Sequence, residues 1–163
     1  AALELLRRDG FAGLTVRRVA AEAGVGAATA YTYFSSKEHL VAEVFWRRLT
    51  SSPCVEHASA DQATRVTEVL AHISLLVADE PEFAGAVTNA LLGKDPDVDA
   101  LRGRIGADIR GRLVAALGAA VDADVIEALE LLYTGTLVWA GMGYEDYPEI
   151  SLRLLKSARL ILR

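Results

Sequence analysis

The sequence predicts an all-α protein, and three observations support that fold class. Apolar residues recur at helical spacing along most of the 163 residues, no segment alternates as a half-buried strand does, and the chain holds only four prolines. Hydrophobic residues make up 52% of the chain, which is high for a soluble protein and indicates large buried surfaces. We expect these surfaces in an internal cavity or at a protein interface.

Glycine and threonine residues mark the ends of three short helices in the N-terminal part of the chain. The first helix should cover residues 1–9 and end at Gly10, because glycine readily adopts the left-handed conformation found after a helix C-terminus. Thr15 has the side chain of an N-cap, so a second helix should follow it. Gly24 should form the turn before a third helix at residues 27–34.

A fourth helix should begin beside two serines and end the N-terminal domain. Ser35 and Glu38 have the spacing of a capping box, although Ser36 could be the cap instead. After this helix comes a segment rich in Ser, Thr and Ala at residues 50–61, which has the composition of a linker. The expected domains are therefore residues 1–50 and residues 51–163.

Four or five longer helices should form the second domain. Pro81 and Asp122 stand where a helix is expected to begin. Asp146 offers a cap for the last helix, followed by an early proline and a glutamate in capping-box position. The expected helices lie at residues 63–78, 81–92, 98–117 and 125–144, and from Asp146 to Leu162.

The helix at residues 125–144 is apolar on two opposite faces, one of which contains Leu129 and Tyr133 and the other Leu131 and Val138. A helix that is apolar all round is buried all round. In a chain this small we expect a second copy to cover one face, in a four-helix arrangement that includes the last helix. The expected dimer contacts are Leu129, Leu132, Tyr133, Thr136, Ala140, Leu152, Leu155 and Ala158.

The stretch from Thr15 to Leu40 has the layout of a helix-turn-helix, whose second helix enters the major groove of DNA. Over residues 1–49 the sequence resembles the TetR family of bacterial repressors. The matching residues are Ala2–Leu6, Gly10–Phe11, Thr15–Arg17, Val19–Ala20, Ala23–Val25, Thr29, Tyr31, Tyr33–Phe34, Ser36–Glu38 and Leu40. The resemblance implies an N-terminal three-helix DNA-binding domain and a C-terminal helical domain that binds a ligand and dimerises. A dimer would read a palindromic operator.

Basic and hydroxyl side chains lie at the edges of this motif, where we expect contacts with DNA phosphates. Thr15 can cap its own helix and also offer a hydroxyl to a phosphate. Arg17 and Arg18 place two positive charges in a first helical turn, which is unfavourable unless an anion binds nearby. Lys37 has the same relation to the fourth helix, and the family position that it matches binds phosphate. The alternatives are a purely structural cap for Thr15 and solvated surface for the arginines.

The third helix carries no charge, because Gly26 and Ala27 stand where the family usually has a serine cap and a basic residue. Bidentate recognition of guanine by Arg or Lys is therefore not available from this helix. Specificity should come from Thr and Tyr hydroxyls, apolar contact with thymine methyl groups, Arg17 or Arg18, and DNA shape. The expected DNA contacts on this helix are Ala27, Thr29, Tyr31, Thr32 and Tyr33, with Val25 and Phe34 in the core.

The resemblance further implies that a small-molecule effector enters the C-terminal helical core and shifts the fourth helix, which changes the separation of the two recognition helices. Since few charges are expected in that interior, an apolar or weakly polar effector is favoured. The candidate lining residues, each of which could equally well fill the core, are Leu76, Phe83, Val87, Leu101, Ile105, Ile109, Leu137 and Trp139.

Charge is divided unevenly between the two expected domains. Residues 1–50 carry a net charge of +2 and residues 51–163 a net charge of −7, which gives −5 for the chain at pH 7. An acidic total does not exclude DNA binding, because only the contact face needs to be basic.

Catalysis and metal binding find little support in the sequence, and no cofactor is expected. His39, His57 and His72 lack the spacing of metal ligands or of a catalytic triad. The single Cys54 excludes an intrachain disulfide and is expected to be a structural thiol in a reducing cytoplasm. The longest uncharged stretch, residues 131–144, is shorter than the ~20 residues of a membrane span. The main alternative function is a dimeric helical bundle that carries a small molecule or lipid and has weakened DNA binding.

Overall fold

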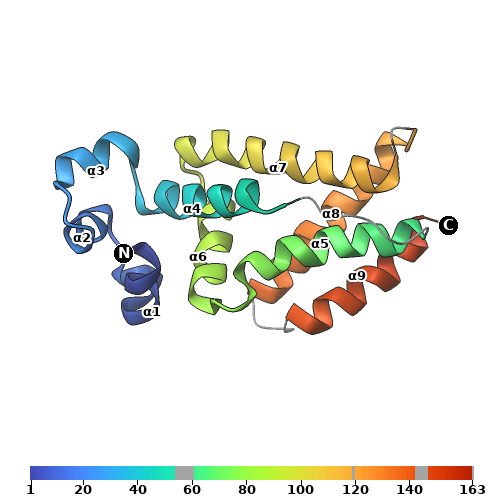
Figure 1. Ribbon diagram of the computed structural model, residues 1–163, viewed down its shortest axis with the longest axis horizontal. Coiled ribbons are helices and arrows are strands. Elements are labelled where there is room, and N and C mark those ends of the chain that lie inside the picture. Colours follow the sequence, from blue (N-terminus) through green and yellow to red (C-terminus); the bar gives the residue numbers. More distant parts are fainter. Residues whose placement is uncertain (54–60, 119, 142–146, 163) are drawn as a thin grey trace. The chain divides into compact units, whose positions relative to one another are not determined.

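The computed structural model describes residues 1–53, 61–118, 120–141 and 147–162, and its regular structure is entirely helical (Figure 1). No β-strand occurs among these residues, which confirms the all-α prediction. Cys54 and the expected cap Asp146 lie outside them. The helices are α1 (Ala2–Gly13), α2 (Val16–Glu22), α3 (Ala27–Tyr33), α4 (Lys37–Ser51), α5 (Gln62–Ala78), α6 (Pro81–Leu92), α7 (Pro96–Leu117), α8 (Ala123–Gly141) and α9 (Tyr147–Ile161).

The chain forms two compact units. The first consists of Ala1–Ser51 together with Asp79–Arg104, and the second of Ser52–Ala78 together with Ile105–Arg163. The break after Ser51 lies one residue from the boundary that the sequence suggested. However, α6 and the first turns of α7, which the sequence assigned to the second domain, pack with the N-terminal helices.

The first unit has a core made by helices that lie far apart in the sequence. Leu5 and Leu6 of α1 and Leu49 of α4 are almost completely buried. Helix α6 packs against both α1 and α4, and its Phe83 is only 2% exposed. A separate cluster joins α2, α3 and the start of α4 and consists of Val16, Ala20, Ala30 and Leu40. Helix α3 is therefore anchored on its buried side to α2 and α4.

Local side-chain and backbone chemistry sets the ends of the first helices much as the sequence indicates. Gly10 has a positive φ of 66° with ψ −179°, so the helical backbone is interrupted there as predicted. Beyond this kink, however, α1 resumes and runs to Gly13. The Thr15 hydroxyl oxygen accepts a hydrogen bond from the backbone N–H of Arg18 at 3.2 Å, which confirms Thr15 as the cap of α2. Gly24 adopts a positive φ of 69° in the turn before α3, as predicted.

Ser36, and not Ser35, caps helix α4. Its hydroxyl oxygen accepts a hydrogen bond from the backbone N–H of His39 at 2.9 Å, so the capping box predicted from Ser35 and Glu38 is wrong and the alternative is confirmed. The Ser36 side chain also hydrogen-bonds to Asp95 in the same unit, and this contact is the main reason that the pKa of Asp95 lies below its ordinary value. Ser36 thus fixes the start of α4 both locally and against the turn that precedes α7.

Replacing Ser36 by alanine should lower the free energy of unfolding by about 1 kcal/mol or somewhat more, because the variant has neither the cap nor the hydrogen bond to Asp95. Ser35→Ala is a matched control, since Ser35 makes only an exposed contact with His39. Urea unfolding followed by circular dichroism measures both variants. Equal decreases in the two variants would contradict the assignment of the cap.

The second unit is built by α5 and α8, which each pack against α9. Leu70 and Ile73 of α5, Leu129 of α8 and Leu154 of α9 are at most 1% exposed. Its buried polar residues in the described part of the chain are Ser74 and Thr136, whose hydroxyls donate to the backbone carbonyls four residues earlier. At the start of α8, Asp122 accepts a hydrogen bond from the backbone N–H of Asp124 at 3.0 Å, which confirms it as a cap.

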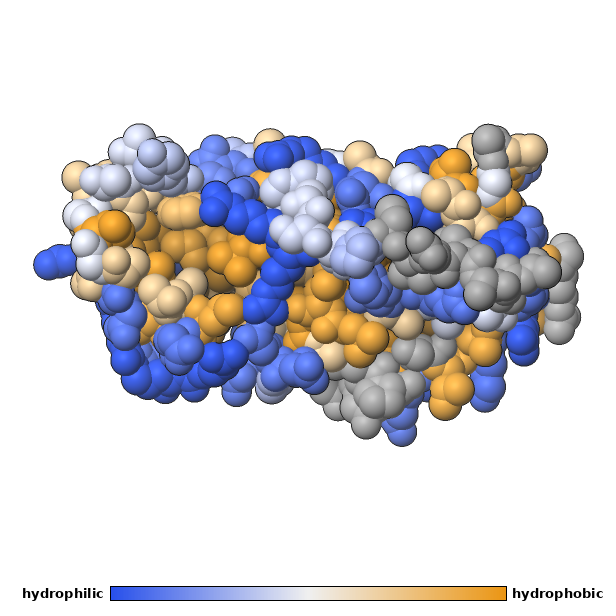
Figure 2. Space-filling view, in the orientation of Figure 1, coloured by the Kyte–Doolittle hydropathy of each residue, from blue (hydrophilic) through white to orange (hydrophobic). Residues whose placement is uncertain are grey.

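The residues expected at the dimer interface differ widely in their exposure within the chain. Leu129, Tyr133, Thr136 and Ala158 are at most 7% exposed within the single chain, in which α9 packs against both α5 and α8. Leu132, Ala140 and Leu155 are half-buried, and Leu152 alone of the expected set is strongly exposed, at 65%. Figure 2 shows hydrophobic side chains reaching the surface in patches among hydrophilic ones. The large apolar side chains exposed on α8 and α9 are Leu131, Trp139, Leu152 and Leu160.

Candidate nucleic-acid interface

Helices α2 and α3 pack against each other across the Gly24 turn and leave most of α3 open to solvent. Ala30 is the one residue of α3 that is buried. Thr29, Tyr31, Thr32 and Tyr33 are all exposed, and the two tyrosines are 52% and 68% exposed, so neither ring is part of the core. Ala27 is half-buried at the first position of the helix. The expected contact residues of α3 therefore lie on an accessible surface that carries no charge.

Two residues near this surface differ from the sequence-based expectation. Val25, which we expected in the core, is 49% exposed at the turn before α3. Ala28 is exposed as well. It was not among the predicted contact residues, because its methyl side chain has no hydrogen-bonding or charged group. The sequence signal that could have indicated Ala28 is its position two residues before Ala30, because residues two apart lie on nearly opposite faces of a helix. Phe34 packs against the cluster of α2, α3 and α4, close to its expected place.

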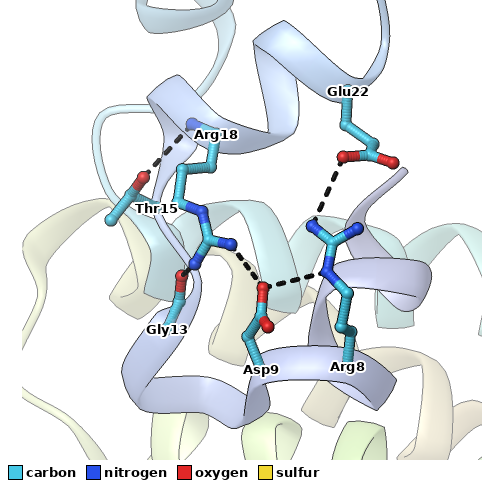
Figure 3. A network of polar contacts seen from close by, with 6 residues as sticks. All are labelled: Arg8, Asp9, Gly13, Thr15, Arg18 and Glu22. Atoms are coloured by element: carbon cyan, nitrogen blue, oxygen red, sulfur yellow. Dashed lines mark hydrogen bonds and ion pairs between the residues drawn. The ribbon is translucent and has the colours of Figure 1, made fainter.

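Four charged side chains join α1 to α2 (Figure 3). The guanidinium group of Arg18 donates to the carboxylate of Asp9 and to the backbone carbonyl of Gly13. Arg8 donates from Nε to the same Asp9 carboxylate at 3.2 Å and lies 3.5 Å from the carboxylate of Glu22. The network holds the start and the end of α2 against α1.

The ionisation of Asp9 reflects this network. Desolvation alone would raise the pKa of Asp9, but the hydrogen bonds and charges of Arg18 and Arg8 outweigh it and hold the pKa below the ordinary value. The same Asp9 contact raises the pKa of Arg8. Asp9 is therefore ionised, and it compensates the positive charge of Arg18 within the chain.

Arg17 is in a different situation from Arg18. Its side chain is exposed in the first turn of α2 and makes no hydrogen bond or ion pair with the part of the chain that the structure describes. Next to it, Thr15 is exposed, and its hydroxyl accepts the capping hydrogen bond while its own proton is available to donate. These two side chains, rather than Arg18, are free to bind an external anion.

Lys37 is tied to the segment after the α1 kink. Its ammonium group donates to the backbone carbonyl of Phe11 at 2.9 Å and lies 4.2 Å from the centre of the Phe11 ring. The side chain is half-buried, although an ammonium has three protons and only one of them is used in this hydrogen bond. Lys37 thus stabilises the junction of α1 and α4 and still has donors to offer to a phosphate.

The structure does not bring the expected effector-lining residues together in one unit. Phe83, Val87 and Leu101 are buried in the first unit. The other five belong to the second unit, where Trp139 is 48% exposed. The second unit contains a pocket of about 420 Å³ that none of the eight residues lines. That pocket is bounded by Gln62, Leu117, Gly118, Ala120, Val121, Val125, Ile161 and Leu162.

The histidines that the structure describes have structural partners. His39 is half-buried on α4 and contacts the Ser35 hydroxyl, and His72 contacts the Ser52 hydroxyl. Among the described residues, no three His, Cys, Asp or Glu side chains are grouped as metal ligands would be. Within the described ranges, none of the helices combines the length and the apolarity that crossing a bilayer requires.

Comparison with known proteins finds a matching family, two relatives and a solved structure with the same fold. Residues 1–44 match the family described as bacterial regulatory proteins, tetR family. Uncharacterized HTH-type transcriptional regulators of Mycobacterium bovis and Mycobacterium tuberculosis are each 49% identical to this chain, over 99% of its length and 77% of their own. The crystal structure of a TetR transcriptional regulator from Rhodococcus sp. RHA1 has the same fold, with a TM-score of 0.83 over 99% of this chain and 92% of that chain, at 21% identity.

Proposed function

This chain belongs to the TetR family of bacterial regulatory proteins, and from that premise we propose that it is a repressor that binds a palindromic operator as a homodimer and is released by a small effector. It is a DNA-binding transcriptional regulator and not an enzyme. The observation that carries the proposal is the accessible face of α3, together with Arg17 on α2, which is exposed and has no ion-pair partner among the described residues. Such a surface suits a helix that enters the major groove while a neighbouring cation binds the backbone.

Exposed apolar side chains on α8 and α9 support a homodimer. Leu131 on α8 and Leu152 on α9 are 67% and 65% exposed, while the opposite sides of both helices are buried within the chain. Trp139 of α8 stacks on the guanidinium of Arg153 of α9 at 5.2 Å, so the two helices meet at this surface. A second copy covering it would produce a twofold dimer, and two recognition helices would then read half-sites about 34–36 Å apart.

Contacts of α6 within the first unit support a route by which an effector could act on DNA binding. Glu80, at the start of α6, forms ion pairs with Arg7 of α1 and Arg48 of α4, each at 2.5 Å. Arg48 also stacks on the ring of Phe83 at 4.5 Å. A shift of α6 would therefore move α4, which follows the recognition helix directly. The effector must bind more tightly to the conformation that does not bind DNA.

We assign the effector to an apolar or weakly polar class. Apart from Ser74 and Thr136, the residues described as buried in the second unit are apolar. The charged Glu68 and Arg112 are half-buried there, and Arg112 is paired with Asp108. Of the residues expected to line the effector site, Leu76, Ile105, Ile109 and Leu137 belong to this unit and are buried or half-buried. Such surroundings favour apolar surface and single hydrogen bonds over ionic groups.

Fluorescence anisotropy tests the proposed function with duplexes recovered by selection from the source genome. We expect tight binding whose logarithm falls linearly with the logarithm of salt concentration, because phosphate contacts release counterions. The expected operator is palindromic, and an apolar effector should release it. Absence of salt-dependent binding to any recovered duplex, together with binding of a fluorescent fatty acid, would favour the carrier function instead.

A further inference from the structure

Two methyl-bearing residues form an exposed line along the recognition helix, on the side opposite its buried residue. Ala30 is the buried residue of α3. With 3.6 residues per turn, the positions that lie opposite Ala30 are Ala28 and Thr32, one turn apart. Both residues are exposed. Thr29 and Tyr31 lie on either side of this line, which we call the Ala28–Thr32 ridge.

The side chains of the ridge have no free hydrogen-bond donor, although one of them is a threonine. The Thr32 hydroxyl donates to the backbone carbonyl of Ala28 at 3.1 Å, so its single proton is used within the helix. With that oxygen turned back toward the backbone, the other group that Thr32 exposes is its γ-methyl. The ridge therefore offers two methyl groups on the exposed side of the helix, opposite Ala30.

The chemistry of the major groove identifies what such a ridge can recognise. The 5-methyl group of thymine is the apolar feature of base edges in that groove, and Ala and the Thr methyl are side chains that contact it. Helix α3 has no charged residue to compete for guanine or cytosine edges. We propose that the Ala28–Thr32 ridge selects operators by contact with thymine methyl groups. This inference rests on the proposed function, because it needs α3 in the major groove.

Deoxyuridine provides a direct test, since it differs from thymidine only by the missing methyl group. The probe is a duplex selected by the protein from a random library and synthesised again with deoxyuridine in place of thymidine. The uracil duplex should bind about fourfold more weakly for each thymine methyl group that the ridge touches, which corresponds to roughly 0.8 kcal/mol per buried methyl-sized group.

Two variants of one residue separate the methyl from the hydroxyl. Thr32→Ser keeps the hydroxyl and its hydrogen bond but removes the methyl, so its preference for thymine over uracil should be smaller. Thr32→Val keeps the methyl group and should retain the preference. Arg17→Ala is the control, because it should weaken both duplexes equally.

Equal affinity of the parent protein for the two duplexes would overturn the ridge proposal and leave the proposed function intact. The same holds if Thr32→Ser keeps the full preference, or if the selected sites contain no common thymine. If the selection recovers no duplex that the protein binds, both proposals are overturned.

Discussion

Replacing Leu131 and Leu152 together by glutamate is expected to leave a folded monomer that binds its operator roughly 10²- to 10⁴-fold more weakly, the range by which joining two binding modules raises affinity. The two leucines are 67% and 65% exposed, so they add little to the core of a single chain. On a twofold interface each new carboxylate would be desolvated close to other carboxylates of the partner subunit. Sedimentation equilibrium gives the mass, and fluorescence anisotropy gives the affinity.

Leu75→Glu combined with Leu92→Glu is the matched control for this prediction. These leucines are 65% and 62% exposed, and they lie on α5 and α6 instead of α8 and α9. The control adds the same charge to the chain and should remain a dimer with unchanged operator affinity. A dimer in the first variant, or a monomer in the control, would remove α8 and α9 from the proposed interface.

The ends of the helices were predictable where they depend on a hydrogen bond or backbone conformation within a few residues of the chain. Thr15 caps α2 and Gly24 forms the next turn, because a hydroxyl oxygen and a positive φ act within three residues. The choice between Ser35 and Ser36 could not be made in the same way. Both serines stand beside the start of α4, and of the two it is Ser36 that also reaches Asp95, which lies 59 positions later in the sequence.

The face that α8 turns inward could not be chosen from the sequence. Both faces of that helix are apolar, so the pattern gave no preference between the Tyr133 side and the Leu131 side. Packing within the chain distinguishes the two faces. Tyr133 is 3% exposed and its hydroxyl contacts that of Ser74 on α5, while Leu131 is 67% exposed. That both faces of α8 are apolar is consistent with the proposed dimer, in which one face packs within the chain and the other against a second copy.

In the candidate site, too, exposed residues of α3 were predictable from the sequence, whereas contacts between distant helices were not. Residue type placed Thr29, Tyr31 and Tyr33 on the recognition helix, and they are exposed there. Arg17 and Arg18 could not be distinguished, since they are neighbours of identical chemistry. Only the fold shows that Arg18 reaches Asp9 on α1 while Arg17 is directed to solvent.

That difference leads to a contrasting pair of variants. Arg17→Ala should weaken operator binding about 10- to 100-fold near 0.1 M salt and reduce the slope of log K against log salt by about 1.8, as expected for one phosphate contact in each of two subunits. Its melting temperature should hardly change, because Arg17 has no partner in the described part of the chain. Anisotropy titrations over a range of salt concentrations measure the slope.

Arg18→Ala should have the opposite profile. Removing its guanidinium group leaves Asp9 with Arg8 as its remaining cationic partner and frees the Gly13 carbonyl, so the melting temperature should fall while the salt slope stays close to that of the parent. Part of this decrease should also be seen in Asp9→Asn, which removes the other end of the same ion pair. If Arg18→Ala changed the salt slope as much as Arg17→Ala, the network of Figure 3 would have to open on DNA, and both arginines would contact phosphates.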